Sequence, residues 1–157
     1  MDTRHKFSVR PGMECTIRSL GDNAGVAQRL AQMGVLPGAT LRVVRLAPFG
    51  KTVEVCMDQG QSFALREEEV RALDCQLLAM PLSSAPIDSE HEYRVRSLAG
   101  GKAFQQRMRA VGLQPGKRFR VPYPEQWPLI LRLEDSGQTP SIGKGEADKI
   151  IVETGDE

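Results

Sequence analysis

The side chains able to do metal or nucleophilic chemistry are few and scattered in this sequence. Three cysteines (Cys15, Cys56 and Cys75) and two histidines (His5 and His91) form neither a CxxC motif nor a cluster with the spacing of metal ligands. Divalent transition metals are bound in proteins by imidazole, thiolate and carboxylate ligands. The weak candidates that remain are Glu67, Glu68, Glu69 and Cys56. The residues alone therefore indicate no metal site, and no cofactor is certain.

The acidic triplet also has a structural explanation, because carboxylates at the start of a helix offset the positive end of its dipole. Catalytic motifs are missing from the sequence. Gly100-Gly101-Lys102 lacks the upstream glycine and the following Ser or Thr of a phosphate-binding loop. Neither histidine lies on a predicted element that could support a hydrolytic triad. We therefore expect no catalytic residues and predict that the chain is not an enzyme.

Cys15 and Cys75 each alternate with apolar neighbours, so both fit inward-facing strand positions, where free cysteines are commonly found. Cys56 falls on the opposite side from Val53, Val55 and Met57 and is predicted to be exposed.

One segment occurs twice and organises the chain. Residues 28–38 (QRLAQMGVLPG) and residues 106–116 (QRMRAVGLQPG) carry arginine, glycine and Pro-Gly at the same spacing. Without a gap, residues 17–43 and 95–121 are identical at ten of 27 aligned positions. The sequence therefore predicts a duplicated small domain, with a first copy at 7–79, a linker at 80–91 and a second copy at 92–154.

Each copy predicts the same order of elements: strand, amphipathic helix, three strands, a one-turn helix and a final strand. Gly34 and Gly112 fit the left-handed position that ends a helix. Pro37-Gly38 and Pro115-Gly116 suit type II turns. We interpret these residues as the structural motif of a mainly β fold with short helices, consisting of two SH3-like small β-barrels in tandem.

Four residues are candidates for binding a partner. Arg29 and Arg107 occupy the same point on the two predicted helices, and Phe49 and Trp127 occupy equivalent hairpin tips. Aromatic and arginine side chains often anchor protein interfaces. Two structural alternatives remain open: each arginine pairs locally, for example with Glu69 or Glu146, and the aromatics pack between the two barrels.

The repeated segment and the residues after it also match a known pattern. The first copy contains Arg29-Leu30-x-x-Met33-Gly34-Val35-x-Pro37-Gly38-x-x-Leu41-x-Val43 and then Leu65-Arg66-x-x-Glu69-Val70-x-x-Leu73. This pattern resembles the FeoA family, small cytoplasmic proteins of bacterial ferrous iron transport. The second copy keeps Arg107, Gly112, Pro115, Gly116 and Glu146 but has Gly143 where the first has Arg66.

The resemblance implies a non-catalytic accessory or regulatory protein of ferrous iron uptake. Its expected partner is the cytoplasmic region of a FeoB-type permease, so it would meet the membrane only through that partner. Self-association stays open. Related domains form the C-terminal module of some iron- and manganese-dependent repressors, in which a DNA-binding helix-turn-helix lies upstream. Because the stretch ahead of the first copy is short, we expect no such helix-turn-helix and no repressor function.

Two other functions remain as alternatives. The resemblance also allows a direct carrier or sensor that binds Fe2+ or another divalent transition metal, and the basic residues allow a small-barrel nucleic-acid-binding protein. The second is supported by a group of basic residues, Arg107, Arg109, Lys117, Arg118 and Arg120. However, 21 basic and 20 acidic residues give a net charge of +1, without the basic excess typical of nucleic-acid binders, so we expect no nucleic acid. Because no apolar run has membrane-spanning length and the start lacks a signal peptide, we expect a soluble cytoplasmic protein.

Overall fold

The computed structural model describes residues 9–49, 51–58 and 60–153 and divides into two compact units. Unit 1 comprises Met1–Leu78 and unit 2 comprises Ala79–Glu157, each with its own apolar core. The predicted outer domain limits, residues 7 and 154, lie outside the described residues. Within the described ranges, no helix combines the length and apolar character needed to cross a membrane.

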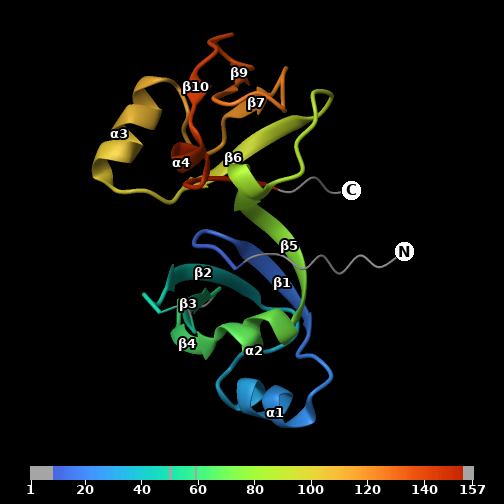
Figure 1. The fold of residues 1–157 in the computed structure, drawn as a ribbon. Helices are drawn as coiled ribbons and strands as arrows, with labels where there is room; N and C mark the ends of the chain where they lie inside the picture. The colour runs from blue at the N-terminus through green and yellow to red at the C-terminus, as the bar shows by residue number, and fades with distance from the viewer. Residues whose placement is uncertain (1–8, 50, 59, 154–157) are drawn as a thin grey trace. The chain divides into compact units, whose positions relative to one another are not determined.

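Unit 1 follows the predicted order of elements. These are β1 (Glu14–Ser19), α1 (Ala24–Gln32), β2 (Thr40–Leu46), β3 (Thr52–Met57), β4 (Ser62–Arg66), α2 (Glu67–Ala72) and β5 (Asp74–Pro81). The strands lie in the order β4-β3-β2-β1-β5 (Figure 1). Val55 of β3 lies opposite Val43 of β2, and Val53 of β3 lies opposite Leu65 of β4. All four side chains are buried, so the apolar positions of these strands form one face of the core.

Unit 2 repeats this order, and its strands after α3 are shorter than their counterparts in unit 1. Its elements are the 3-10 turn η1 (Leu82–Ser84), β6 (Glu92–Leu98), α3 (Lys102–Ala110), β7 (Arg118–Arg120), β8 (Leu129–Ile130), β9 (Arg132–Leu133), β10 (Ser141–Ile142), α4 (Lys144–Ala147) and β11 (Ile150–Glu153). The strand expected at 128–134 is split into β8 and β9. Strands β11, β6, β7 and β9 are neighbours in that order, and β8 pairs separately with β10.

The mainly β class with short helices is confirmed, whereas the expected pair of closed barrels is not. Nine strands form one open sheet in the order β4-β3-β2-β1-β5-β11-β6-β7-β9. Among the described residues, β4 and β9 are the ends of that order, so it closes no ring. The last residues of β5, Ala79–Pro81, pair antiparallel with β11.

Residues 80–91, for which the sequence predicts a linker, contain the end of β5 and the turn η1. Leu82 in that turn is fully buried in the core of unit 2. A single apolar residue between prolines and serines shows no periodicity, so its burial was not evident from the sequence.

Both long helices end in the same way. In unit 1, Gly34 has φ of 96°, and the Val35 N–H donates to the Leu30 carbonyl over 2.9 Å. In unit 2, Gly112 has φ of 90°, and the Leu113 N–H donates to the Met108 carbonyl over 2.8 Å. This is the Schellman arrangement, which satisfies carbonyl groups at the end of a helix. It directs the chain into the Pro-Gly turn that starts the next strand.

Gly34→Ala and Gly112→Ala should destabilise the protein by different amounts. A side chain in the left-handed region costs about 1–2 kcal/mol. A Cβ at residue 34 would meet only atoms 3.8 Å away, whereas one at residue 112 would lie 3.0 Å from Leu133 Cδ1. We therefore expect urea unfolding to show a loss of about 1 kcal/mol for Gly34→Ala and a larger loss for Gly112→Ala. Equal losses would show that space around the two positions does not matter.

Candidate functional site

In unit 1 the candidate residue Arg29 forms an ion pair with a buried carboxylate. Glu69 stands in the first turn of α2 and its side chain is only 6% exposed, while that of Arg29 is 47% exposed. Oε1 of Glu69 accepts a hydrogen bond from the Arg66 backbone N–H over 2.8 Å, and Oε2 pairs with the Arg29 guanidinium. The carboxylate thus caps α2 and joins it to α1. The local-pairing alternative for Arg29 is confirmed.

In unit 2 the equivalent residues form the same combination of a helix cap and an ion pair. Oε1 of Glu146 accepts from the Gly143 backbone N–H over 3.0 Å, and Oε2 pairs with Arg107 of α3. We call these two arrangements the Arg–Glu clamps, Arg29–Glu69 and Arg107–Glu146. Both guanidinium groups remain partly exposed, so the clamps position the arginines without removing them from the surface.

The two hairpin tips differ in how they present their aromatic residues. Phe49, between β2 and β3, is 93% exposed, whereas Trp127, between β7 and β8, is 37% exposed. The Lys144 ammonium lies 5.5 Å from the centroid of the Trp127 ring, within the range of a cation–π interaction. Tyr123 of the same loop is exposed. Phe49 is therefore the more open anchor of the two.

Each of the three glutamates proposed as metal ligands in the acidic triplet forms an ion pair with an arginine. Glu67 pairs with Arg71 over 3.2 Å, Glu68 approaches Arg66 at 3.9 Å, and Glu69 belongs to its clamp. Cys56 lies apart on β3, where its thiol donates to the Met57 carbonyl over 3.5 Å. No group of three or more His, Cys, Asp or Glu side chains among the described residues is arranged to hold a metal ion.

Four of the five basic residues that suggested a nucleic-acid surface have acidic partners. Lys117 pairs with Asp135 at 2.8 Å, Arg118 with Glu92 at 3.6 Å and Arg120 with Glu134 at 3.2 Å. Arg107 belongs to the second clamp. Because these carboxylates offset the positive charge, the arrangement offers little attraction for a phosphate backbone.

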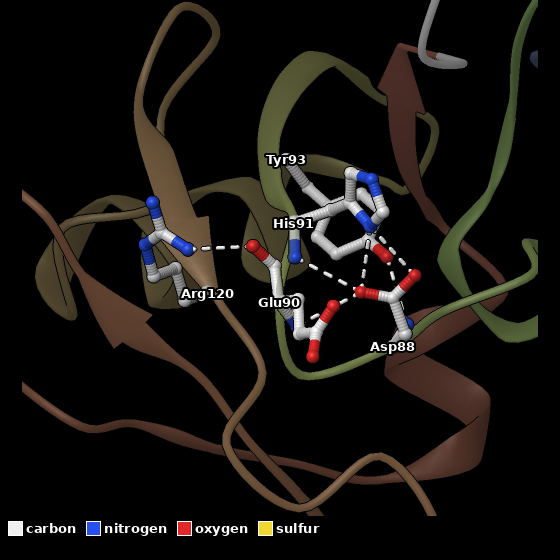
Figure 2. A network of polar contacts seen from close by, with 5 residues as sticks. All are labelled: Asp88, Glu90, His91, Tyr93 and Arg120. Atoms are coloured by element: carbon white, nitrogen blue, oxygen red, sulfur yellow. Dashed lines mark hydrogen bonds and ion pairs between the residues drawn. The ribbon is translucent and has the colours of Figure 1, made fainter.

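A polar network that the sequence did not reveal orders residues 88–93 (Figure 2). The Asp88 carboxylate accepts from the backbone N–H groups of Glu90 and His91 over 2.8 and 2.9 Å, and from the His91 ring over 2.6 Å. The Tyr93 hydroxyl accepts from the Asp88 N–H over 2.9 Å, and Arg120 donates to the Glu90 carbonyl over 2.9 Å. An aspartate that bonds the backbone two residues further on is a turn signal, so Asp88 is the residue from which this turn could have been predicted.

Removing the His91 ring should raise the pKa of Asp88. The pKa of this carboxyl lies below its usual value, chiefly because of the hydrogen bond to His91 and secondly because of the Glu90 N–H. A lowered pKa favours folding above the unfolded-state pKa, and this contribution is lost as pH falls through the folded-state pKa. For His91→Ala, a carbonyl-detected NMR titration should show the Asp88 midpoint at higher pH. An unchanged midpoint would mean that the backbone bonds suffice.

Comparisons with known proteins identify the family. The family model for the FeoA domain matches the chain twice, at residues 8–76 and 80–154. The chain therefore belongs to the FeoA family, with two FeoA domains in tandem. Members are non-catalytic accessory proteins associated with ferrous iron transport, in agreement with the prediction that the chain is not an enzyme. No curated protein matches this sequence.

Several solved structures resemble the chain. The iron(II) transport protein A from Clostridium thermocellum is 24% identical, with a TM-score of 0.47, over 100% of this chain and 90% of that one. An iron uptake regulatory protein (FeoA) is 31% identical, with a TM-score of 0.40, over 48% and 96%. The FeoA protein from Chlorobium tepidum is 28% identical, with a TM-score of 0.41, over 45% and 67%.

Proposed function

We propose that this protein is a cytoplasmic accessory or regulatory protein of ferrous iron uptake that binds the cytoplasmic region of a FeoB-type permease. The first FeoA domain makes the main contact through the tip of the β2–β3 hairpin. The observation that carries this proposal is the exposure of Phe49, at 93% of its surface. A large apolar side chain open to water is a natural anchor for a partner surface.

A second exposed apolar residue on the same hairpin supports this choice. Val44 of β2 is exposed, as is Leu36 in the turn that leads into β2. In unit 2 the equivalent Trp127 is partly covered and interacts with Lys144. We therefore assign the contact to unit 1 and a supporting role to unit 2. Arg29, held by its clamp but partly exposed, adds a positive group with a defined position.

The alternative of an Fe2+ carrier or sensor has less support, because Glu67, Glu68 and Glu69 are all engaged by arginines. It is tested by anaerobic titration with Fe2+. Stabilisation of the folded protein by the metal would favour this alternative over the adaptor function.

Phe49→Ala should weaken capture of the permease without weakening the fold. Truncating an interface anchor typically costs 2 kcal/mol or more, so we expect the dissociation constant to rise by about 30-fold. The free energy of unfolding should change by less than about 0.5 kcal/mol, since the ring makes little contact with its own domain. Affinity is measured by biolayer interferometry with detergent-solubilised FeoB-type permease, and stability by urea unfolding.

The matched control is Tyr123→Ala, which removes an exposed aromatic from the corresponding loop of unit 2. We expect it to bind like the unmodified protein. Equal affinity for Phe49→Ala and the unmodified chain would refute the assignment of the hairpin. Failure of the folded, unmodified chain to bind the permease would refute the proposed function itself.

A further inference from the structure

Two of the three cysteines come together in unit 1. Cys15 lies on β1 and Cys75 on β5, and these strands are neighbours in the sheet. Cys15 is fully buried in the core, and Cys75 packs against that core while keeping part of its surface exposed. Each thiol is the largest influence on the pKa of the other, so the two side chains lie close together. Residues directly opposite each other on neighbouring strands have Cα atoms about 5 Å apart, which is within the range that a disulfide spans.

The pair is chemically asymmetric. The Cys75 pKa is lowered, chiefly because the Cys15 thiol donates its hydrogen to the Cys75 sulfur. The Cys15 pKa is raised by the same bond and by burial. The more accessible sulfur is thus the better thiolate, while the buried sulfur keeps its proton. A reactive outer thiol next to a buried resolving thiol is the arrangement that thiol–disulfide exchange requires.

We propose that Cys15 and Cys75 are an oxidation site, which forms an intramolecular disulfide on exposure to a low-molecular-weight disulfide. The Cys75 thiolate attacks one sulfur of glutathione disulfide, forms a mixed disulfide and releases one glutathione thiolate. That thiolate takes the Cys15 proton, and the Cys15 sulfur then attacks the Cys75 sulfur and releases the second glutathione. Two protein thiols are oxidised, and one glutathione disulfide is reduced to two glutathione molecules.

The third cysteine is a built-in control. In the sheet register, Cys15 lies opposite Leu41 and Leu41 opposite Met57, and these three buried residues share one face. Cys56 directly precedes Met57 in β3 and so points to the other face. The sheet itself therefore separates Cys56 from the pair, even though all three cysteines belong to unit 1.

The test uses the full chain, folded, in buffers with increasing ratios of glutathione disulfide to glutathione. Remaining thiols are blocked with a maleimide in denaturant, and the products are analysed by intact mass and peptide mapping. In oxidising buffer we expect one label, on Cys56, out of three cysteines, with Cys15 and Cys75 in one cross-linked peptide pair. The oxidised unit 1 should melt about 10 °C higher, since the bond closes a long loop of the unfolded chain.

Variants make the outcome decisive. Cys56→Ser should form the same disulfide and carry no label, whereas Cys75→Ser should leave both remaining thiols free of any intramolecular bond. The proposal is overturned if the wild-type chain keeps all three labels where the buffer oxidises a reference dithiol of −230 mV potential, about that of a glutaredoxin. A disulfide that includes Cys56, or a glutathione adduct on Cys75 that never resolves, also overturns it. Because the readout is made on the wild-type chain, failure of a variant to fold does not affect the result.

Discussion

Phe119→Ala is expected to unfold the second unit while the first unit remains folded. Phe119 is fully buried in the core of unit 2, with its ring 5.9 Å from that of Tyr93 at an angle of 33°. Removing a buried phenylalanine costs about 3–5 kcal/mol. A domain of this size is stable by only about 5 kcal/mol, so the loss nearly abolishes folding.

The effect is measured on the full chain by 1H–15N correlation spectra, in which each unit reports its own fold. Resonances of unit 2 should collapse to random-coil positions, while those of residues in the unit 1 core keep their dispersion. Leu30→Ala, which truncates an equally buried residue of unit 1, is the matched variant and should cost about 2–5 kcal/mol in that unit. Loss of both sets of resonances in each variant would show that the two cores fold as one.

The same pair of variants also bears on function. Under the proposal above, Phe119→Ala should still bind the permease, and Leu30→Ala should not. The reverse pattern would assign the contact to the second FeoA domain.

Glu69→Ala should destabilise unit 1 by about 2–3 kcal/mol. It removes the acceptor of the Arg66 N–H and the partner of Arg29, and hydrogen bonds to charged groups are worth about 1.5–3 kcal/mol. The same change at Glu146 should cost less, because that carboxylate is more exposed and water competes with its bonds. Urea unfolding of the three proteins measures the difference.

Glu68→Ala is the control for the effect of charge alone, because it removes an exposed carboxylate from the same helical turn. That carboxylate lies 3.9 Å from the Arg66 guanidinium. We expect a change within about 0.5 kcal/mol. If Glu68→Ala and Glu69→Ala cost the same, the helix dipole and not the clamp would account for the acidic triplet.

Local patterns in the sequence were enough to predict the order of elements. The alternation of Val53, Val55 and Met57 and the stripe of Val26, Leu30 and Met33 fix a strand and a helix without reference to the rest of the chain. The duplication strengthened the prediction, because the same order of elements was predicted independently in each copy. Aligning the copies offered local ion pairs of Arg29 and Arg107 as one open alternative, and the structure shows both pairs.

Pairings between distant segments could not be predicted in this way. Nothing in residues 79–81 or in β11 indicates that they pair, so the open sheet was missed. Cys15 and Cys75 were each placed inward by alternation, but their contact depends on β1 and β5 being neighbours. The difference between Phe49 and Trp127 likewise depends on where Lys144 lies in the folded chain.

The hydrogen bonds that Glu69 and Glu146 accept from the main chain explain why the two copies can differ at the position of Arg66 and Gly143. Glu69 bonds the main chain of Arg66, and Glu146 bonds the main chain of Gly143, so the side chain at that position takes no part in the bond. Nineteen of the twenty amino acids supply the required N–H, and proline alone does not. A sequence alignment scores a mismatch here although the two copies form the same bond. Duplication therefore leaves this position free to diverge, and an arginine or a glycine can stand there while the turn beneath it is unchanged.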